Sequence, residues 1–180
     1  MPVLVFALQF KGNAAPAAGA DGKLSARTTA RGQIHRTTLG ADGVRGRVQS
    51  TAGASASFDS KVEVGDDGAF LESGRIRYGR AGSLTFQTVG RGTLGPSGLE
   101  QIQRGAVIWE VTGGDGAFAG ATGLITSNFT VDAQGKVVDN QFAQLFLPDR
   151  PPARPAARVS ARPPRAAAPK PSRLAARRRR

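Results

Sequence analysis

At 180 residues the chain has room for one domain of ordinary size, and 25 basic against 13 acidic residues give a net charge of +12. It has no cysteine, which excludes a disulfide framework, a thiol nucleophile and every metal site built on thiolates. No run reaches the roughly twenty apolar residues that a membrane-spanning helix needs, so we expect a cytoplasmic protein.

The positive charge is concentrated at one end. Residues 149–180 carry eleven of the 25 basic residues and a single acid, so they contribute +10 and the preceding residues only +2. This segment is rich in proline and almost free of large apolar side chains, and therefore cannot build a core. The sequence predicts a globular domain over 1–148 and a disordered basic tail over 149–180.

The body of the chain reads as short β-prone runs without a ten-residue window of helical periodicity. The first run lacks the basic residues that begin a secretory signal, and Gln9 and Lys11 interrupt it, so we expect a strand there and consider secretion the weaker alternative. Ser97–Arg104 has room for one short turn. The expected strands are Val3–Lys11, Thr29–Thr38, Val44–Ser50, Ala54–Val64, Ala69–Tyr78, Ser83–Val89, Ala106–Thr112, Gly123–Val131 and Lys136–Leu147.

Small turn clusters separate these runs, and most contain an aspartate followed by glycine. Such clusters join neighbouring antiparallel strands, because the closing glycine adopts a positive φ that other residues avoid. The closing glycines are Gly43, Gly68, Gly82, Gly116 and Gly135. Glycines inside the runs predict close packing at bends of a curved sheet; they are Gly32, Gly46, Gly74 and Gly105.

Apolar and polar residues alternate in the clearest runs, as they do around Trp109, where Val107 and Val111 oppose Ile108 and Glu110. Period-two alternation is typical of antiparallel sheets that have one polar face. Without covering helices, about eight such strands must pack on a second sheet or close on themselves. The sequence predicts an all-β fold, a single closed antiparallel β-barrel of about eight strands.

A glycine-dense corner joins two of the expected strands. Residues 107–123 read VIWEVTGGDGAFAGATG, and this segment resembles the strand–corner–strand of the allene oxide cyclase and dirigent-like barrels, with decreasing similarity over roughly 60–147. The matching positions are Gly113, Gly114, Gly116, Phe118, Gly120, Ala121 and Gly123.

The resemblance implies an eight-stranded barrel of the lipocalin-like group, often a trimer, with an apolar lumen. Plant members cyclise an unstable epoxide, and dirigent proteins steer the coupling of bound phenoxy radicals. The present chain lacks cysteine and has a single tyrosine, Tyr78, so the catalytic residues of the plant enzymes are not carried over.

The corner also superficially matches a dinucleotide-binding loop, with the pattern G-x-G-x-x-A over Gly114–Ala119. That chemistry needs a helix starting at the loop, and the glycines and β-branched residues that follow oppose one. We therefore interpret the loop as structural. His35 is the only histidine and cannot form a multi-histidine metal site, so neither a metal nor a cofactor is predicted.

Several large or polar side chains on these strands are candidates for a ligand pocket. Glu110 and Asn128 are weak catalytic candidates, because a desolvated carboxyl acquires a raised pKa and can act as an acid or base. Asp139, Gln141 and Thr126 belong to the same polar group, and the pattern leaves open whether the group points inward or outward. The full set of pocket candidates is Phe86, Trp109, Glu110, Asn128, Phe129 and Phe142.

The basic tail is a candidate for non-specific binding to nucleic acid or to an anionic membrane surface, since clustered cations release counterions from polyanions. It has no aromatic residue for base stacking. An extension without function is the alternative. Its candidate residues are Arg173, Arg177, Arg178, Arg179 and Arg180.

Three functions are compatible with the sequence. The leading one is a binding module, possibly a homotrimer or other homo-oligomer, that encloses a small apolar, aromatic or lipid-like molecule. The second is an isomerase or cyclase on the same barrel, acting mainly by shaping its ligand. The third is an interaction protein with a solid barrel, tethered by its tail to RNA or an anionic membrane.

Overall fold

The computed structural model describes residues 1–17 and 23–149, apart from the side chains of residues 52–54. Residues 1–149 form one compact unit. The predicted tail lies outside the described residues beyond Asp149, as do Arg173 and Arg177–Arg180, so its binding role stays a prediction. In the described part of the chain, no helix is long and apolar enough to cross a membrane.

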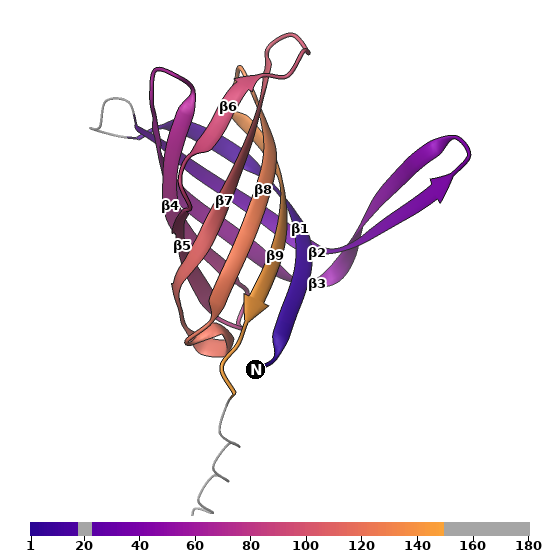
Figure 1. Cartoon of the computed structure of the whole chain (residues 1–180), viewed down its shortest axis with the longest axis vertical. Helices are drawn as coiled ribbons and strands as arrows, with labels where there is room; N and C mark the ends of the chain where they lie inside the picture. The colour runs from indigo at the N-terminus through magenta and orange to yellow at the C-terminus, as the bar shows by residue number, and fades with distance from the viewer. Residues whose placement is uncertain (18–22, 150–180) are drawn as a thin grey trace, which may run out of the picture. The chain divides into compact units, whose positions relative to one another are not determined.

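The unit is an antiparallel all-β structure, as the alternating pattern predicted (Figure 1). The only other element in the described ranges is a three-residue 3-10 turn, η1, at Gly116–Phe118. The strands are β1 (Val3–Pro16), β2 (Lys23–Gly40), β3 (Gly43–Val64), β4 (Ala69–Tyr78), β5 (Ser83–Thr88), β6 (Gly92–Pro96), β7 (Ile102–Gly114), β8 (Thr122–Asp132) and β9 (Lys136–Phe146).

Eight of these strands form a closed ring of hydrogen-bonded neighbours. Their order is β3-β2-β1-β9-β8-β7-β5-β4, and pairing between β3 and β4 joins the two ends. The short β6 bridges β4 and β7 at one end of the ring, through Thr93 opposite Ala69 and Ala106. Closure of the ring gives hydrogen-bond partners to backbone N–H and C=O groups that would be unpaired at the edges of an open sheet.

The strands differ from the predicted ones in three respects. β1, β2 and β7 extend further, residues 43–64 form one strand, β3, where two were expected, and β6 is an additional strand. β3 is continuous because it stays paired with β2 on both sides of the predicted break, with a register shift between Arg31 and Gln33 of β2. β6 was not predicted, because two glycines and a proline in five residues show no alternation; its pairing with β4 and β7 holds it in place.

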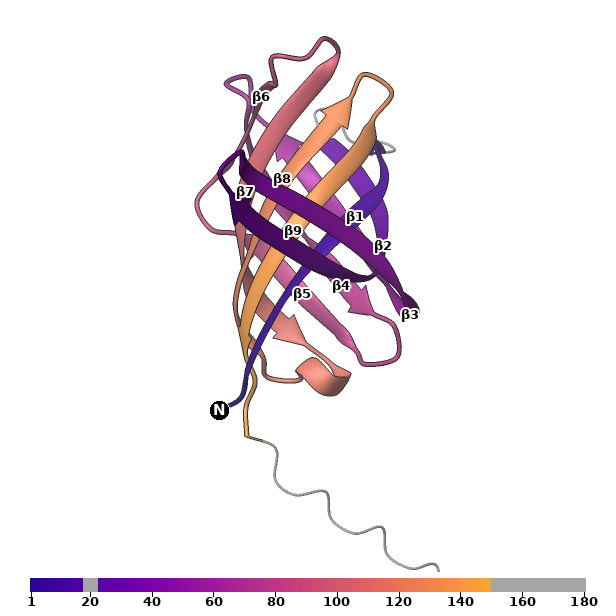
Figure 2. The ribbon, with the colours of Figure 1, turned by 90° about the vertical axis from the view of Figure 1, so that its right-hand side faces the viewer.

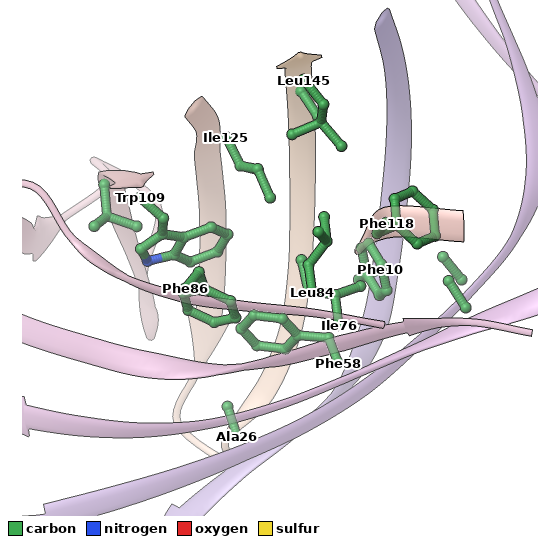
Figure 3. Packing of buried hydrophobic residues seen from close by; sticks show 14 of the residues in the cluster. Phe10, Ala26, Phe58, Ile76, Leu84, Phe86, Trp109, Phe118, Ile125 and Leu145 are labelled. Carbon is green, nitrogen blue, oxygen red and sulfur yellow. The ribbon is translucent and has the colours of Figure 1, made fainter. Parts of the chain in front are cut away.

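Aromatic rings from four strands fill the middle of the ring. Phe58 of β3 stacks on Phe86 of β5 with 5.5 Å between ring centroids, and Trp109 of β7 packs 4.6 Å from Phe86 (Figure 3). Phe10 of β1 lies 6.0 Å from Phe58. All four rings are almost completely removed from solvent. The centre is therefore packed solid, and any hollow must lie toward the ends.

The glycine-dense corner closes one end of the ring. Phe118 of η1 is buried there and packs 4.9 Å from Tyr78. Asp115 accepts hydrogen bonds from the backbone N–H and the hydroxyl of Ser83, at 2.7 and 2.8 Å, which ties the corner to β5. We predicted that no helix begins behind Asp115, and the structure has only η1 there, a single 3-10 turn that is far too short to act as a dinucleotide-binding helix.

The turn glycines behave as predicted, since all five closing glycines have positive φ. The explanation offered for the strand glycines holds only in part. A Cβ on Gly74 would lie 2.3 Å from the Asp59 carbonyl oxygen, and one on Gly105 would lie 2.2 Å from the Phe129 ring. Around Gly46, by contrast, nothing lies within 4 Å. Close packing therefore explains Gly74 and Gly105, and the prediction was wrong for Gly46.

Gly46 is open because its strand has left the ring. Residues 33–50 of β2 and β3, which we call the arm, pair only with each other, from Gln33 opposite Ser50 to Gly40 opposite Gly43. The arm has no neighbouring strand on either side, because β1 pairs with β2 only as far as Thr29 and β4 pairs with β3 only from Ala56. The arm projects from the ring as an isolated two-stranded ribbon (Figure 1).

Candidate functional site

A small pocket lies inside the end of the ring opposite the corner. Its volume is about 80 Å³, and strand ends from β1 to β4 and from β6 to β9 surround it. Most of its lining is apolar, and Trp109 separates it from the packed centre. The lining residues are Ala14, Leu24, Ala26, Phe58, Val62, Val64, Phe70, Glu72, Leu94, Trp109, Ser127, Phe129, Val131, Val137 and Asp139.

Glu72 is one of two carboxyl groups in this apolar lining. It occupies an inward position of β4, between Phe70 and Ile76 in the same row, and is 8% exposed. The Ser60 hydroxyl donates a 2.5 Å hydrogen bond to its Oε1 atom. Burial raises the pKa of Glu72 from 4.5 to about 7, and the charge of Asp139 adds to the rise. Glu72 therefore holds a proton in a large fraction of molecules at neutral pH.

Asp139 is the second carboxyl group and lies on β9. The Ser127 hydroxyl and the Gln141 side-chain amide each donate to it, both at 2.6 Å. Burial raises its pKa to about 6, although these two hydrogen bonds oppose the rise. Asp139 is therefore mostly ionised at neutral pH, while Glu72 is poised between its two forms.

The pocket also offers an unused donor. The indole N–H of Trp109 faces Glu72 but lies outside hydrogen-bonding geometry, so this buried nitrogen has no hydrogen-bond partner among the described residues. A buried polar group without a partner costs free energy that a ligand with an acceptor would recover. The lining can thus surround the apolar part of a ligand and form hydrogen bonds with a polar group at one end of it.

The structure separates the predicted pocket residues into two groups. Phe86 is buried in the centre, and Trp109 and Phe129 line the pocket. Glu110 and Asn128 are exposed on the outer face, where Glu110 accepts a 2.6 Å hydrogen bond from Gln87.

Phe142 is also on the outer face and is 50% exposed. This corrects the expectation that Glu110, Asn128 and Phe142 border the lumen. The reason is that side chains along a strand alternate between the two faces of the sheet. Glu110, Asn128 and Phe142 face outward because their sequence neighbours face inward, and those neighbours are Trp109, Ser127 and Gln141. Asp139 belongs to the same inward row as Gln141. Asp139 and Gln141, named with the polar group, do face inward, and Thr126 faces outward beside Phe142.

Sequence reasoning missed Glu72 and the two serines that accompany the carboxyls. A signal was present for Glu72, because Phe70, Glu72, Gly74 and Ile76 share one row of an alternating strand. A carboxyl in a row that ends in Phe and Ile is a candidate buried acid. Within the described ranges, no three Asp, Glu or His side chains come together as a metal site would require.

A wider hollow of about 790 Å³ lies on the outer surface over β2, β3, β4 and β5. Serine and threonine line much of it, together with Arg27, Lys61 and Arg75. Arg27 forms a 2.9 Å ion pair with Asp59 in the same hollow. Its charges are exposed and of both signs, so the hollow favours no single class of ligand and the interior pocket is the stronger candidate.

Comparison of the chain with protein-family models, with curated proteins and with solved structures finds no match.

Proposed function

We propose that the closed ring is a β-barrel of the allene oxide cyclase and dirigent-like type, and that it binds a small, largely apolar molecule by one polar end. The observation that supports this is the pocket itself: an apolar lining that contains two buried carboxyls, Glu72 and Asp139, and an unpaired indole N–H. Ligand sites commonly combine apolar walls with a few convergent polar groups whose pKa values are shifted.

The pocket's size limits the ligand. A cavity that holds one water needs about 10–15 Å³, and a pocket of about 80 Å³ accommodates only a short apolar group. Phe58, Phe86 and Trp109 block the way to the centre. A long acyl chain does not fit, whereas a short branched or cyclic alcohol or ketone does, with any longer part extending from the end of the ring.

A second function, an isomerase-type enzyme, is favoured by one observation. A carboxyl with a pKa of about 7 both gives and takes a proton readily at neutral pH, which is what general acid–base catalysis needs. Glu72 would carry that role, with Asp139 as the charged neighbour. Glu110 and Asn128 are replaced as candidates because they face solvent.

Binding can be tested with cyclopentanol and cyclopentane as probes. Trp109, the only tryptophan in the chain, reports on the pocket through its fluorescence. We expect cyclopentanol to shift the emission and to bind more tightly than cyclopentane. Native mass spectrometry of the full chain provides the second readout, a small co-purified molecule.

Two matched variants separate pocket binding from other effects. Leu94→Phe fills the pocket and should abolish both signals, whereas Leu124→Phe, at a half-exposed position of β8, should leave both unchanged. Equal binding by both variants, or the absence of any probe response in the unaltered chain, would contradict the proposal.

A further inference from the structure

The large hydrophobic residues that remain exposed gather on two surfaces. Of thirteen in the described part of the chain, four lie on the arm and six on the outer face of β1, β9, β8 and β7 and the residue after β5. We call the second surface the wall. On the arm they are Ile34, Leu39, Val44 and Val48, and on the wall Val3, Val5, Val89, Ile108, Leu124 and Phe142.

The arm is amphipathic, because opposed residues of an antiparallel pair share a face and successive residues alternate between faces. One face carries His35 opposite Val48 and Leu39 opposite Val44. The other carries Arg36 opposite Arg47, with Arg45 nearby and Ile34, the fourth exposed hydrophobic residue of the arm, on the same face. Leu39 is 81% and Val44 68% exposed, so the apolar face is uncovered within one chain. An isolated two-stranded ribbon is marginally stable in water and gains most from covering such a face.

The wall is a band of mainly apolar residues with a few polar ones among them. Phe142 of β9 is flanked across the strands by Ala7 of β1 and Thr126 of β8, and Thr126 pairs in turn with Ile108. The next row contains Val5, Gln144 and Leu124. Glu110, paired with Leu124 at the β7 edge of the band, is the one charged residue of these two rows, and the uncharged remainder suits the apolar face of the arm.

The arm projects over the wall without lying on it. Figure 1 shows the arm standing away from the ring, and Figure 2, from that side, shows it crossing in front of β7, β8, β9 and β1. At its base, Gln33 accepts a 3.0 Å hydrogen bond from the backbone N–H of Gln9 on β1. Gln33 belongs to the same face as His35 and Leu39, so the apolar face begins turned toward β1.

We propose that two copies of the chain associate by exchanging arms, each arm laying its apolar face on the wall of the other copy. The arrangement is two-fold symmetric, because one arm and one wall on each chain make two identical contacts. Each arm has eight residue pairs, so with a rise of about 3.3 Å per residue it is about 26 Å long. Two arms on two walls then bury on the order of 1,000 Å², near the lower limit for a specific interface.

The first test is the mass of the full chain by sedimentation, after nuclease treatment and in ~0.5 M salt, where the Debye length of about 4 Å suppresses bridging by polyanions. We expect a dimer. Leu39→Ser combined with Val44→Ser should raise the dissociation constant at least tenfold. The matched control, Arg36→Ser combined with Arg47→Ser on the opposite face, should leave it unchanged.

Disulfide trapping tests the geometry, since the chain has no cysteine of its own. Mixing Val44→Cys chains with Leu124→Cys chains under oxidation should give a mixed covalent dimer. Mixing Val44→Cys with Leu99→Cys, at an exposed leucine outside the wall, should not. A monomer in the first test, equal trapping of the two pairs, or association that depends on Arg36 and Arg47 through a nucleic acid would each overturn the proposal.

Discussion

Glu72 on β4 and Asp139 on β9 line the same pocket, and after burial itself the charge of Asp139 is a further cause that raises the pKa of Glu72. Each carboxyl has a serine donor, Ser60 for Glu72 and Ser127 for Asp139. The two acids therefore ionise in sequence as pH rises, Asp139 first. The carboxyl protons of Glu72 and Asp139 therefore affect both the stability of the fold and the chemistry of the pocket.

We expect the free energy of unfolding to fall as pH rises from about 4.5 to about 7. Over this range the unfolded chain loses the proton of Glu72 while the folded chain keeps it, and above the folded pKa both are ionised and the decline ends. Asp139 contributes in the same direction over a lower range, up to about pH 6. At about 1.4 kcal/mol per pKa unit, Glu72 (4.5 to about 7) and Asp139 (3.8 to about 6) together contribute on the order of 6 kcal/mol.

Urea denaturation at a series of pH values measures this dependence. Glu72→Gln should remove most of the decline between pH 6 and pH 7, close to the folded pKa of about 7. Glu110→Gln, at an exposed carboxyl, serves as the control and should leave the slope as it is. A decline of the same size in Glu72→Gln would show that another group is responsible.

Trp109 fluorescence should titrate with a midpoint near pH 7, since the single tryptophan of the chain lines the pocket beside Glu72. Ionisation of Glu72 places a negative charge close to the indole ring and changes its emission. The transition should disappear in Glu72→Gln and shift to lower pH in Asp139→Asn, because the neighbouring charge is gone. An unchanged midpoint in both variants would place the titrating group elsewhere.

Gly74→Ala should destabilise the protein by about 1–3 kcal/mol, as expected when extra volume is forced into a packed site. The new Cβ would lie 2.3 Å from the Asp59 carbonyl oxygen and 2.8 Å from the Phe86 ring. Gly46→Ala is the matched control, because its surroundings are empty and its effect should be neutral or slightly stabilising. Thermal unfolding of both variants measures the difference in stability. An equal loss of stability in the two variants would contradict the packing argument.

Asp115→Asn should destabilise the corner at neutral pH and have little effect in strong acid. Hydrogen bonds from Ser83 hold the pKa of Asp115 below its usual value, so the stabilisation exists above the unfolded pKa and is lost as pH falls through the folded one. Comparing urea midpoints of the variant and the unaltered chain at pH 7 and at pH 2 tests this. A difference that persists at pH 2 would mean that geometry, not charge, is what Asp115 contributes.

Local features of the fold were predictable because their causes are local. Closing glycines such as Gly43 and Gly135 adopt positive φ, as their turn sequences require. Alternation around Trp109 correctly separated Val107 from Ile108, since side chains on a strand alternate whatever the strand packs against. The corner could be recognised from its glycines, though the 3-10 turn inside it depends on hydrogen bonds to residues 81 and 83, more than thirty positions earlier.

The candidate site was harder to predict from the sequence than the fold, because its residues depend on which row of each strand faces inward. On β7, alternation placed Trp109 and Glu110 on opposite faces, and yet both were named as pocket candidates. On β9, alternation alone did not show that Asp139 and Gln141 face inward and Phe142 outward. Only the register of β9 with β1 and β8 decides it, since a shift by one residue would exchange the two faces.

The sequence by itself determined that the described residues before the tail form antiparallel strands joined by glycine turns, because backbone preference and period-two alternation act over a few residues. Tertiary structure alone decided that β1 meets β9 to close the ring, that Glu72 and Asp139 share a pocket, and that residues 33–50 leave the ring as an arm. Those outcomes depend on hydrogen bonds and packing between residues far apart in the chain, and no local pattern encodes which distant partners will meet.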